Sequence, residues 1–157
     1  MILASALGSA GFLWWVLAII TAVYRERRPA AWRLLLALGF TFLINDYVLK
    51  PMVHRPRPFE AIADLSVIDA KPATLSFPSG HAAMAVAGAI AGARMLPLAA
   101  WALWPLGVIV AVSRVYVGVH WPTDVIAGVI VGLACAWFVL GGRRAVEATP
   151  SAGLPAG

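Results

Sequence analysis

The sequence has few charged residues and a single cysteine. Charged residues make up 12% of its 157 positions, whereas about 25% is typical of a soluble domain. This scarcity, with an apolar content of 62% and a mean hydropathy of +0.87, excludes an ordinary soluble protein and indicates a membrane protein. Cys135 cannot form an internal disulfide, and its apolar neighbours predict a role in packing.

Acidic residues are also scarce, seven against twelve lysines and arginines, which leaves a net charge of +5. In a soluble protein this excess would suggest a nucleic-acid partner. Here the basic residues cluster at the ends of apolar runs, which is typical of membrane topology. We therefore expect contact with the lipid bilayer and no nucleic-acid partner. The sequence identifies neither a protein partner nor an oligomeric state.

Long apolar runs predict an all-α fold, an integral membrane bundle of about five transmembrane helices. A run of about 20 residues forms a helix of roughly 30 Å, the thickness of the hydrocarbon core. The third run is short and rich in alanine and glycine, which predicts close packing at the bundle centre. The predicted spans are residues 5–24, 32–49, 82–95, 98–112 and 125–140.

The chain divides into a membrane-embedded domain and a short tail. Residues 1–144 form the predicted domain, and residues 145–157, which contain two prolines and two glycines, form a predicted disordered tail. The first ten residues contain no lysine or arginine, and the first run is longer than the apolar core of a signal peptide. We therefore expect this run to be retained as a span.

Five spans place the polar connections after the second and fourth runs on one membrane face. The opposite face carries more arginines, so the positive-inside tendency makes it cytoplasmic. We predict a multi-pass protein of the cell (inner) membrane whose site faces the extracytoplasmic side. The arginines of the predicted cytoplasmic face are Arg25, Arg27, Arg28, Arg33, Arg94, Arg143 and Arg144.

The polar stretch before the last apolar run contains Ser113, Arg114, His120 and Asp124. Ionisable side chains at mid-membrane cost about 2.5–3.5 kcal/mol each on insertion scales, so they are usually paired or functional. Pro122 fits the first turn of a helix, which places His120 and Asp124 four residues apart on one face. The carboxylate can then accept the proton of one imidazole nitrogen and leave the other nitrogen as a nucleophile or base.

A basic segment follows the second apolar run, where three prolines interrupt residues 50–58 and predict an irregular chain. Its cations, Lys50 and Arg57 among them, either snorkel as the flank of a span or form an anion site. The prolines favour the anion site, because they fix the direction of the cationic side chains, which the basic flank of a span does not require. Ser79 is a predicted N-cap, so the backbone N–H groups from Gly80 onward can also attract an anion.

These groups are predicted to meet on one membrane face. Lys50, Arg57 and Arg114 supply three cations, and His81 and His120 supply two imidazoles. A phosphoryl group spreads negative charge over three oxygens during transfer, and the planar fork of arginine suits phosphate. The set therefore favours a phosphoryl group over a carboxylate as the ligand.

For several neighbouring polar residues, the sequence allows both a structural and a functional role. Asn45 and Asp46 either hydrogen-bond to neighbouring helices inside the bundle or take part in catalysis. The hydroxyl of Ser113 bonds either to the backbone or to phosphate. His54 and Arg55 are expected to give local support or to contact lipid headgroups.

Three motifs together resemble the signature of the type 2 phosphatidic acid phosphatase (PAP2) superfamily. Eleven positions agree with it in identity, order and spacing, and the helical pattern extends the resemblance from about residue 5 to residue 141. The motifs are Lys50, Arg57 and Pro58; Pro78, Ser79, Gly80 and His81; and Ser113, Arg114, His120 and Asp124.

The resemblance implies catalysis through a phosphohistidine, with no metal or other cofactor. His120, held by Asp124, would attack phosphorus, and His81 would protonate the leaving lipid oxygen and later help to activate water. The two histidines and the aspartate resemble a metal-ligand set, but the surrounding cations oppose metal binding. The phosphoryl oxygens would be held by Lys50, Arg57, Ser79, Gly80 and Arg114.

The implied activity is that of an integral membrane lipid phosphatase acting on a phosphomonoester or diphosphate of a membrane lipid. Undecaprenyl diphosphate, phosphatidate and phosphatidylglycerol phosphate are the candidate substrates. Vanadium-dependent haloperoxidases share the signature but are soluble, which five apolar spans oppose. The alternative from another class is a non-enzymatic protein that binds or transports a lipid phosphate or another anion with the same cationic pocket.

Overall fold

The computed structural model describes residues 11–68 and 71–147, without the side chains of residues 142–147. Over these residues the chain is all-α, as predicted. Short helical segments connect the longer helices: η2 (Arg25–Arg27), η3 (Leu43–Leu49), α4 (Lys50–Val53), α5 (Pro58–Ala61) and η4 (Pro97–Ala99). The longer helices are α2 (Phe12–Val23), α3 (Arg28–Phe42), α6 (Gly80–Met95), α7 (Ala100–Tyr116) and α8 (Pro122–Glu147).

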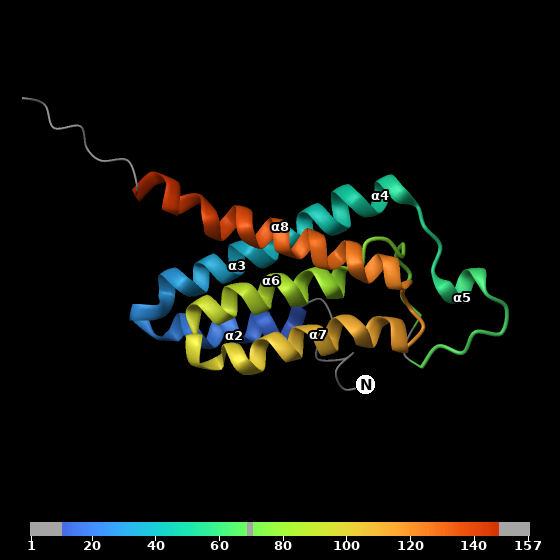
Figure 1. Ribbon diagram of the computed structural model, residues 1–157, viewed down its shortest axis with the longest axis horizontal. Helices are drawn as coiled ribbons and strands as arrows, with labels where there is room; N and C mark the ends of the chain where they lie inside the picture. The colour runs from blue at the N-terminus through green and yellow to red at the C-terminus, as the bar shows by residue number, and fades with distance from the viewer. Residues whose placement is uncertain (1–10, 69–70, 148–157) are drawn as a thin grey trace, which may run out of the picture.

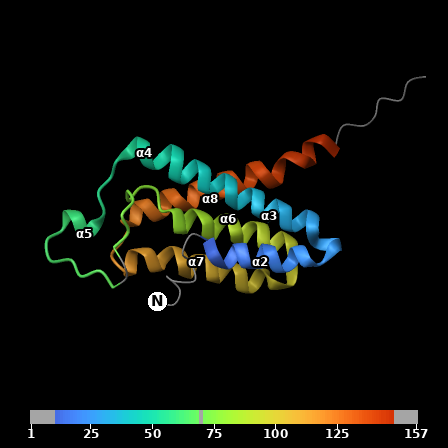
Figure 2. The same ribbon diagram turned by 180° about the vertical axis from the view of Figure 1, so that it is seen from behind.

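The long helices run side by side in one bundle, with α6 in its middle (Figure 1, Figure 2). The α6 helix packs against α3, α7 and α8, and most of its small side chains are buried. Glycines of α8 permit this approach: a Cβ on Gly128 would lie 2.4 Å from the carbonyl oxygen of Ser79, and a Cβ on Gly132 would lie 2.4 Å from that of Ala83. The predicted close packing of the third apolar run is confirmed.

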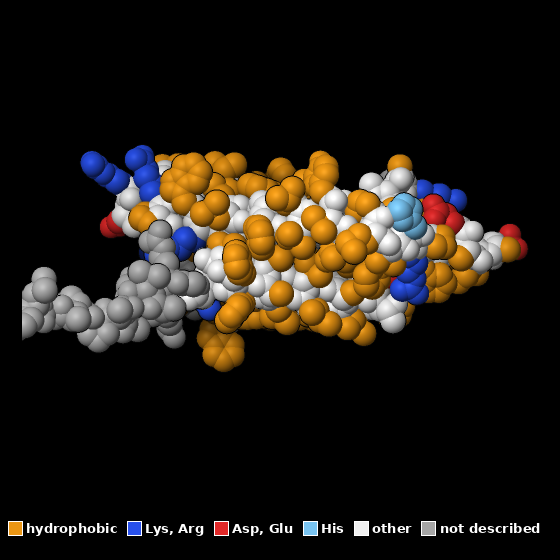
Figure 3. Space-filling model, turned by 90° about the horizontal axis from the view of Figure 1, so that it is seen from above, with side chains coloured by type: hydrophobic (Ala, Val, Ile, Leu, Met, Phe, Trp, Pro, Cys, Tyr) orange, Lys and Arg blue, Asp and Glu red, His pale blue; other side chains and the backbone are white. Residues whose placement is uncertain are grey.

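Three stretches of the described chain are long and apolar enough to cross a membrane, judged by length and composition: Arg25–Ala61, Pro97–Tyr116 and Pro122–Gly141. The α2 helix is apolar but shorter. Large apolar side chains such as Trp101 and Trp137 project from the bundle surface. Figure 3 shows apolar side chains along the body of the molecule and charged side chains gathered at its two ends, the pattern expected of a protein that crosses a bilayer.

The second predicted span is longer than expected. The α3 helix continues through the π-helical segment η3 into α4, because Leu43 and Leu49 keep right-handed helical backbone angles. The prediction of irregular chain from Lys50 onward is therefore wrong for residues 50–53. Pro51 lies inside this rod, just after the π-helical segment. The helix ends at His54, whose φ is 48°.

Two other boundaries differ from the sequence prediction. The α8 helix continues past residue 140 to Glu147, because each glycine weakens a helix interior by only about 1 kcal/mol. The first predicted span begins at residue 5, but residues 1–10 lie outside the description. Residues 145–147 of the predicted tail continue α8 and are helical. Residues 148–157 are outside the description, so their disorder stays a prediction.

Candidate active site

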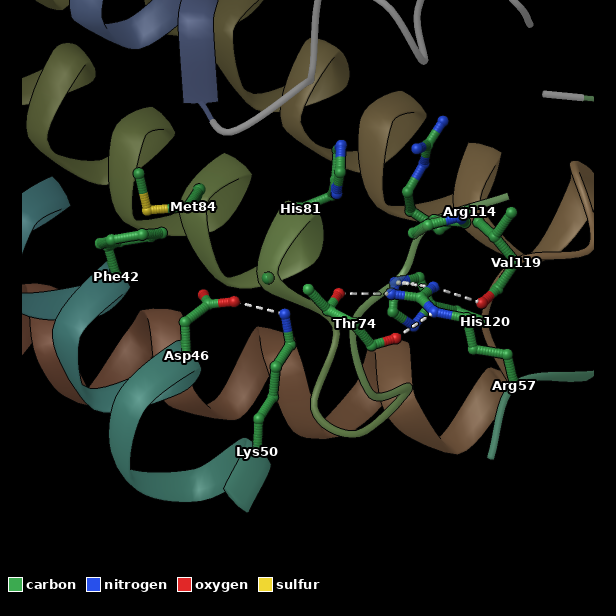
Figure 4. A pocket seen from close by; sticks show the side chains of 12 residues that line it. Phe42, Asp46, Lys50, Arg57, Thr74, His81, Met84, Arg114, Val119 and His120 are labelled. Atoms are coloured by element: carbon green, nitrogen blue, oxygen red, sulfur yellow. Dashed lines mark hydrogen bonds and ion pairs between the residues drawn. The ribbon is translucent and has the colours of Figure 1, made fainter. Parts of the chain in front are cut away.

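The three sequence motifs meet at one end of the bundle, where they line a cavity of about 180 Å³ (Figure 4). The motif residues come from α4, from the chain around α5, from the start of α6, from the end of α7, and from the connection to α8 and its first turn. Two other predicted site residues, Ser79 and Asp124, are fully buried and do not line the cavity. The predicted residues that line it are Lys50, Arg57, Gly80, His81, Arg114 and His120.

His120 lies in the connection just before α8 and is 4% exposed. Its Nδ1 is 3.5 Å from Oδ2 of Asp124, the pairing that the four-residue spacing predicts. Its Nε2 is 3.4 Å from Nη1 of Arg57, and both residues line the cavity. Burial lowers the pKa of His120, the Asp124 hydrogen bond opposes that shift, and the Arg57 charge adds to it. The imidazole is therefore neutral at pH 7 and can act as a nucleophile.

Asp124 accepts hydrogen bonds from three donors and lies 3.5 Å from the His120 ring. Oδ2 accepts hydrogen bonds from the hydroxyl of Ser76 and from the backbone N–H of Trp121, the latter at 3.0 Å. Oδ1 accepts one from Nη1 of Arg55 at 2.8 Å. Sequence reasoning missed Ser76, because no spacing pattern marks a single serine in an irregular loop. Arg55 was expected to give local support, and the structure makes it a direct partner of the aspartate.

Arg57 is 2% exposed and its guanidinium is bound on several sides. Nε donates to the carbonyl oxygen of Thr74 at 2.6 Å, and Nη2 donates to the Thr74 hydroxyl at 3.0 Å and to the Leu75 carbonyl at 3.3 Å. Nη1 donates to the Val119 carbonyl at 2.8 Å. These bonds fix the positive charge beside His120, so little side-chain freedom is lost when an anion binds there.

Lys50 is 8% exposed, although lysine is rarely buried without a partner. Its Nζ forms an ion pair with Oδ1 of Asp46. Oδ2 of Asp46 accepts a hydrogen bond of 3.2 Å from Asn45, whose amide also donates to the Pro78 carbonyl at 3.5 Å. Of the two interpretations of Asn45, the structure therefore favours a buried polar residue that hydrogen-bonds to a neighbouring segment. Asp46 lines the cavity.

The N-terminus of α6 forms another wall of the cavity. Ser79 is its N-cap, as predicted, and its hydroxyl accepts a 3.4 Å hydrogen bond from Ala82. The Ser79 backbone N–H donates to the Asp124 carbonyl at 2.9 Å, which ties the start of α6 to α8. Gly80 and His81 in the first turn line the cavity, where the helix dipole favours negative charge.

Arg114 lies at the end of α7 and is 3% exposed. Its backbone carbonyl accepts a 3.2 Å hydrogen bond from the N–H of His120. Figure 4 shows its side chain extending away from the His120 ring, whereas Arg57 lies beside the ring. The hydroxyl of Ser113 donates to the Val110 carbonyl at 2.7 Å, which favours the backbone interpretation of that serine.

The described residues contain no group of three or more histidines, cysteines and acidic residues close enough to hold a metal ion. The acidic side chain nearest to His120 in the site, Asp124, already has four polar neighbours: Ser76, Arg55, Trp121 and the ring itself. Chemically, the arrangement supplies a neutral imidazole, a second histidine, three cations and a helix N-terminus around one small cavity. Such a set is suited to in-line transfer of a phosphoryl group.

Residues 30–145 match the sequence model of the PAP2 superfamily. The chain is 34% identical over 125 residues to an undecaprenyl-diphosphatase of Sulfolobus acidocaldarius, covering 77% of this chain and 59% of that protein. It is 34% identical over 135 residues to a decaprenylphosphoryl-5-phosphoribose phosphatase of Mycobacterium tuberculosis. The match covers 83% of this chain and 73% of that protein. The crystal structure of a transmembrane PAP2-type phosphatidylglycerolphosphate phosphatase from Bacillus subtilis is similar, with a TM-score of 0.73 and 28% identity over 94% of this chain and 76% of that chain.

Proposed function

The chain belongs to the PAP2 superfamily, and from this premise we propose that it is a membrane lipid phosphatase that transfers a terminal phosphoryl group to His120 and then to water. One observation supports this most strongly. The neutral His120 lines the cavity with the fixed guanidinium of Arg57 at 3.4 Å from its Nε2, while Oδ2 of Asp124 lies 3.5 Å from its Nδ1. A histidine with a purely structural role would be packed against other side chains, whereas His120 borders a cavity that three cations also line.

In the first step, the Nε2 lone pair of His120 attacks phosphorus and the bond from phosphorus to the lipid oxygen breaks. His81, in the same cavity, takes up a proton as the negatively charged substrate binds beside it, and donates that proton to the leaving oxygen. The Asp124 carboxylate keeps the proton of His120 on Nδ1 and stabilises the positive charge that develops on the ring. Lys50 and Arg57 neutralise the phosphoryl oxygens, and Arg114 adds positive charge from another part of the cavity lining.

In the second step, water attacks the phosphorus of the phosphohistidine and the bond between phosphorus and nitrogen breaks. His81, now unprotonated, accepts the proton of that water. Inorganic phosphate leaves, and His120 returns to its neutral form. Every proton transfer uses a side chain of this protein, so the cycle needs no cofactor.

The first substrates to test are polyprenyl phosphates and diphosphates. The names of two relatives specify undecaprenyl and decaprenylphosphoryl lipids, and the first relative is covered over only 59% of its length. Phosphatidate and phosphatidylglycerol phosphate are the further candidates. The cavity holds polar groups for a phosphoryl group, and a long apolar tail would remain in the bilayer beside the exposed apolar surface.

The proposed topology has five spans: α2, the continuous rod from α3 to α4, α6, α7 and α8. The α6 helix has 16 residues and is surrounded by other helices, so it needs little contact with lipid. Arginines gather at the end of the bundle opposite the cavity, which supports a cytoplasmic end there and an extracytoplasmic site in the cell (inner) membrane. Those described by the structure are Arg25, Arg27, Arg28, Arg33 and Arg94.

The test compares wild type, His120→Ala and His54→Ala in detergent with a chelator present. Phosphate release is measured on a panel of lipid phosphates and diphosphates, and phosphoenzyme is trapped by acid quench with a ³²P-labelled substrate. We expect His120→Ala to lose phosphoenzyme and nearly all turnover while it still binds lipid phosphate. His54 lines a neighbouring cavity and not this one, so His54→Ala controls for the loss of a nearby histidine that the mechanism does not use. Retained turnover in His120→Ala would remove the mechanism, and binding without turnover in the wild type would favour the non-enzymatic alternative.

A further inference from the structure

The catalytic cavity contains an acidic side chain that the proposed mechanism does not use. Asp46 is the only carboxylate among the described residues that line it, opposite three cations and two histidines. Its Oδ1 is paired with Nζ of Lys50, and its Oδ2 accepts the hydrogen bond from Asn45. A negative charge inside a site for a negative substrate is unfavourable for binding unless it has a function.

The carboxylate lies where an anion would be expected to bind. A Cβ placed on Gly80 would be 3.3 Å from Oδ2 of Asp46 and 3.8 Å from Nζ of Lys50. The Asp46 carboxylate therefore lies against both the lysine and the first turn of α6. The helix N-terminus and the lysine both attract negative charge. Figure 4 shows the Asp46 and Lys50 side chains meeting at the cavity.

We infer that Asp46 is a specificity-determining residue, whose carboxylate occupies the position of a phosphoryl oxygen between Lys50 and the α6 N-terminus until substrate displaces it. This inference rests on the proposed function, and it adds a requirement that decides which class of phosphate the enzyme binds. An incoming anion must compete with an internal carboxylate for Lys50. A terminal phosphate, with up to two negative charges, competes better than a phosphodiester, which carries one.

This competition has a use at a membrane surface. The headgroups of common membrane phospholipids are phosphodiesters, and they are far more abundant than any lipid with a terminal phosphate. A cationic cavity without Asp46 would bind those headgroups and be inhibited by them. The carboxylate therefore lowers the affinity for every anion, so that the weaker-binding diester headgroups no longer occupy the cavity while a terminal phosphate or diphosphate still binds.

A neighbouring cavity can accommodate the displaced Asp46 carboxylate. A second cavity of about 510 Å³ adjoins the first and shares Phe42, Asp46, Lys50 and Thr74 with it. Because Asp46 borders both cavities, rotation of its side chain can move the carboxylate off Lys50 without a backbone movement. The backbone there is held by the fully buried Asn45, which bonds to the Pro78 carbonyl.

A simpler role would be to orient Lys50 for the substrate. The two roles predict opposite signs when the charge is removed. If Asp46 orients Lys50, Asp46→Asn leaves a less ordered lysine and weakens anion binding. If Asp46 competes with the anion, Asp46→Asn strengthens it.

The experiment measures inhibition of the purified enzyme by inorganic phosphate and by phosphatidylglycerol in mixed micelles. We expect Asp46→Asn to lower both inhibition constants by roughly tenfold or more, the scale of one charged hydrogen bond. The KM for the lipid phosphate falls as well. Asp46→Glu keeps the charge and stays within about threefold of wild type. Asp64→Asn is the matched control, because it removes the same charge at an exposed loop position whose φ of 61° asparagine tolerates.

Unchanged or higher inhibition constants in Asp46→Asn would overturn the inference. Asp46→Ala is the second variant if the asparagine variant does not fold, and the same direction is expected of it. Binding of ³²P-labelled inorganic phosphate to the same variants needs no turnover. It therefore tests Asp46 even if the wild type releases no phosphate, a result that would defeat the proposed function alone.

Discussion

Nη1 of Arg55 lies 2.8 Å from Oδ1 of Asp124, although 69 residues separate them in the sequence. The same nitrogen is 2.6 Å from the hydroxyl of Thr123, and the guanidinium lies over the Trp121 ring at 5.3 Å. Arg55 therefore clamps the chain after α4 onto the first turn of α8. Because Asp124 holds His120, this contact joins the phosphate-binding segment to the nucleophile.

Removing that clamp is expected to slow catalysis more than it weakens binding. In Arg55→Ala the Asp124 carboxylate loses a charged partner and the His120 ring loses its fixed orientation. We expect kcat to fall about 10- to 100-fold, the range for groups that orient catalytic ligands, with KM changed by less than about threefold. Arg55→Lys keeps the charge but not the planar fork, so it should recover only part of kcat. Equal activity of all three enzymes would contradict this role.

The Ser76 hydroxyl should matter for the same reason. It donates to Oδ2 of Asp124, the oxygen that faces His120. Ser76→Ala leaves that buried oxygen with one donor fewer, and we expect kcat to fall by about tenfold. Steady-state phosphate release checks this, with the exposed Ser66→Ala as the control. A kcat within twofold of the control would show that the other donors suffice.

The contact between α8 and α6 should tolerate no added methyl group at Gly128. The new Cβ would lie 2.4 Å from the Ser79 carbonyl oxygen, so α8 must move away from the start of α6. We expect Gly128→Ala to destabilise the fold by about 1–3 kcal/mol and to lower activity, because Ser79 bonds to Asp124. Gly39→Ala in α3 is the matched control, since nothing lies within 4 Å of its new Cβ. It should leave the midpoint of thermal unfolding unchanged or slightly higher.

The acid side of the pH profile should report His120. Its pKa is lowered from the ordinary 6.5, mainly by burial, and the nucleophile must be unprotonated. The imidazole therefore stays neutral as pH falls through 6.5, and kcat/KM should decline only at a lower pH.

A variant separates this titration from that of the substrate. Arg57 lowers the pKa of His120, so Arg57→Gln should move the acid limb of kcat/KM to higher pH. The ionisation of the substrate is the same for both enzymes and cancels in the comparison. A limb at the same pH in both enzymes would assign it to the substrate or to another group.

Much of the site could be predicted because its parts are local. His120 and Asp124 are four residues apart at a helix start, and Ser79 caps the helix that it precedes. Helix geometry alone places such pairs, and the motif spacing supplied Lys50, Arg57 and Arg114. The continuation of α3 into α4 was not predictable in this way. Pro51 indicated the end of a helix, but the chain stays helical through Lys50–Val53 because the helix before it continues.

The sequence by itself determined the all-α class, the membrane environment and the identity of the cations and histidines that line the cavity. These follow from hydropathy, from helix capping and from short-range spacing, which depend on neighbouring residues only. Tertiary structure alone decided that Ser76 and Arg55 hold Asp124, that Thr74 holds Arg57, and that the Asp46 carboxylate faces Gly80. These contacts join segments that meet only when the helices pack around α6, so no local pattern encodes them.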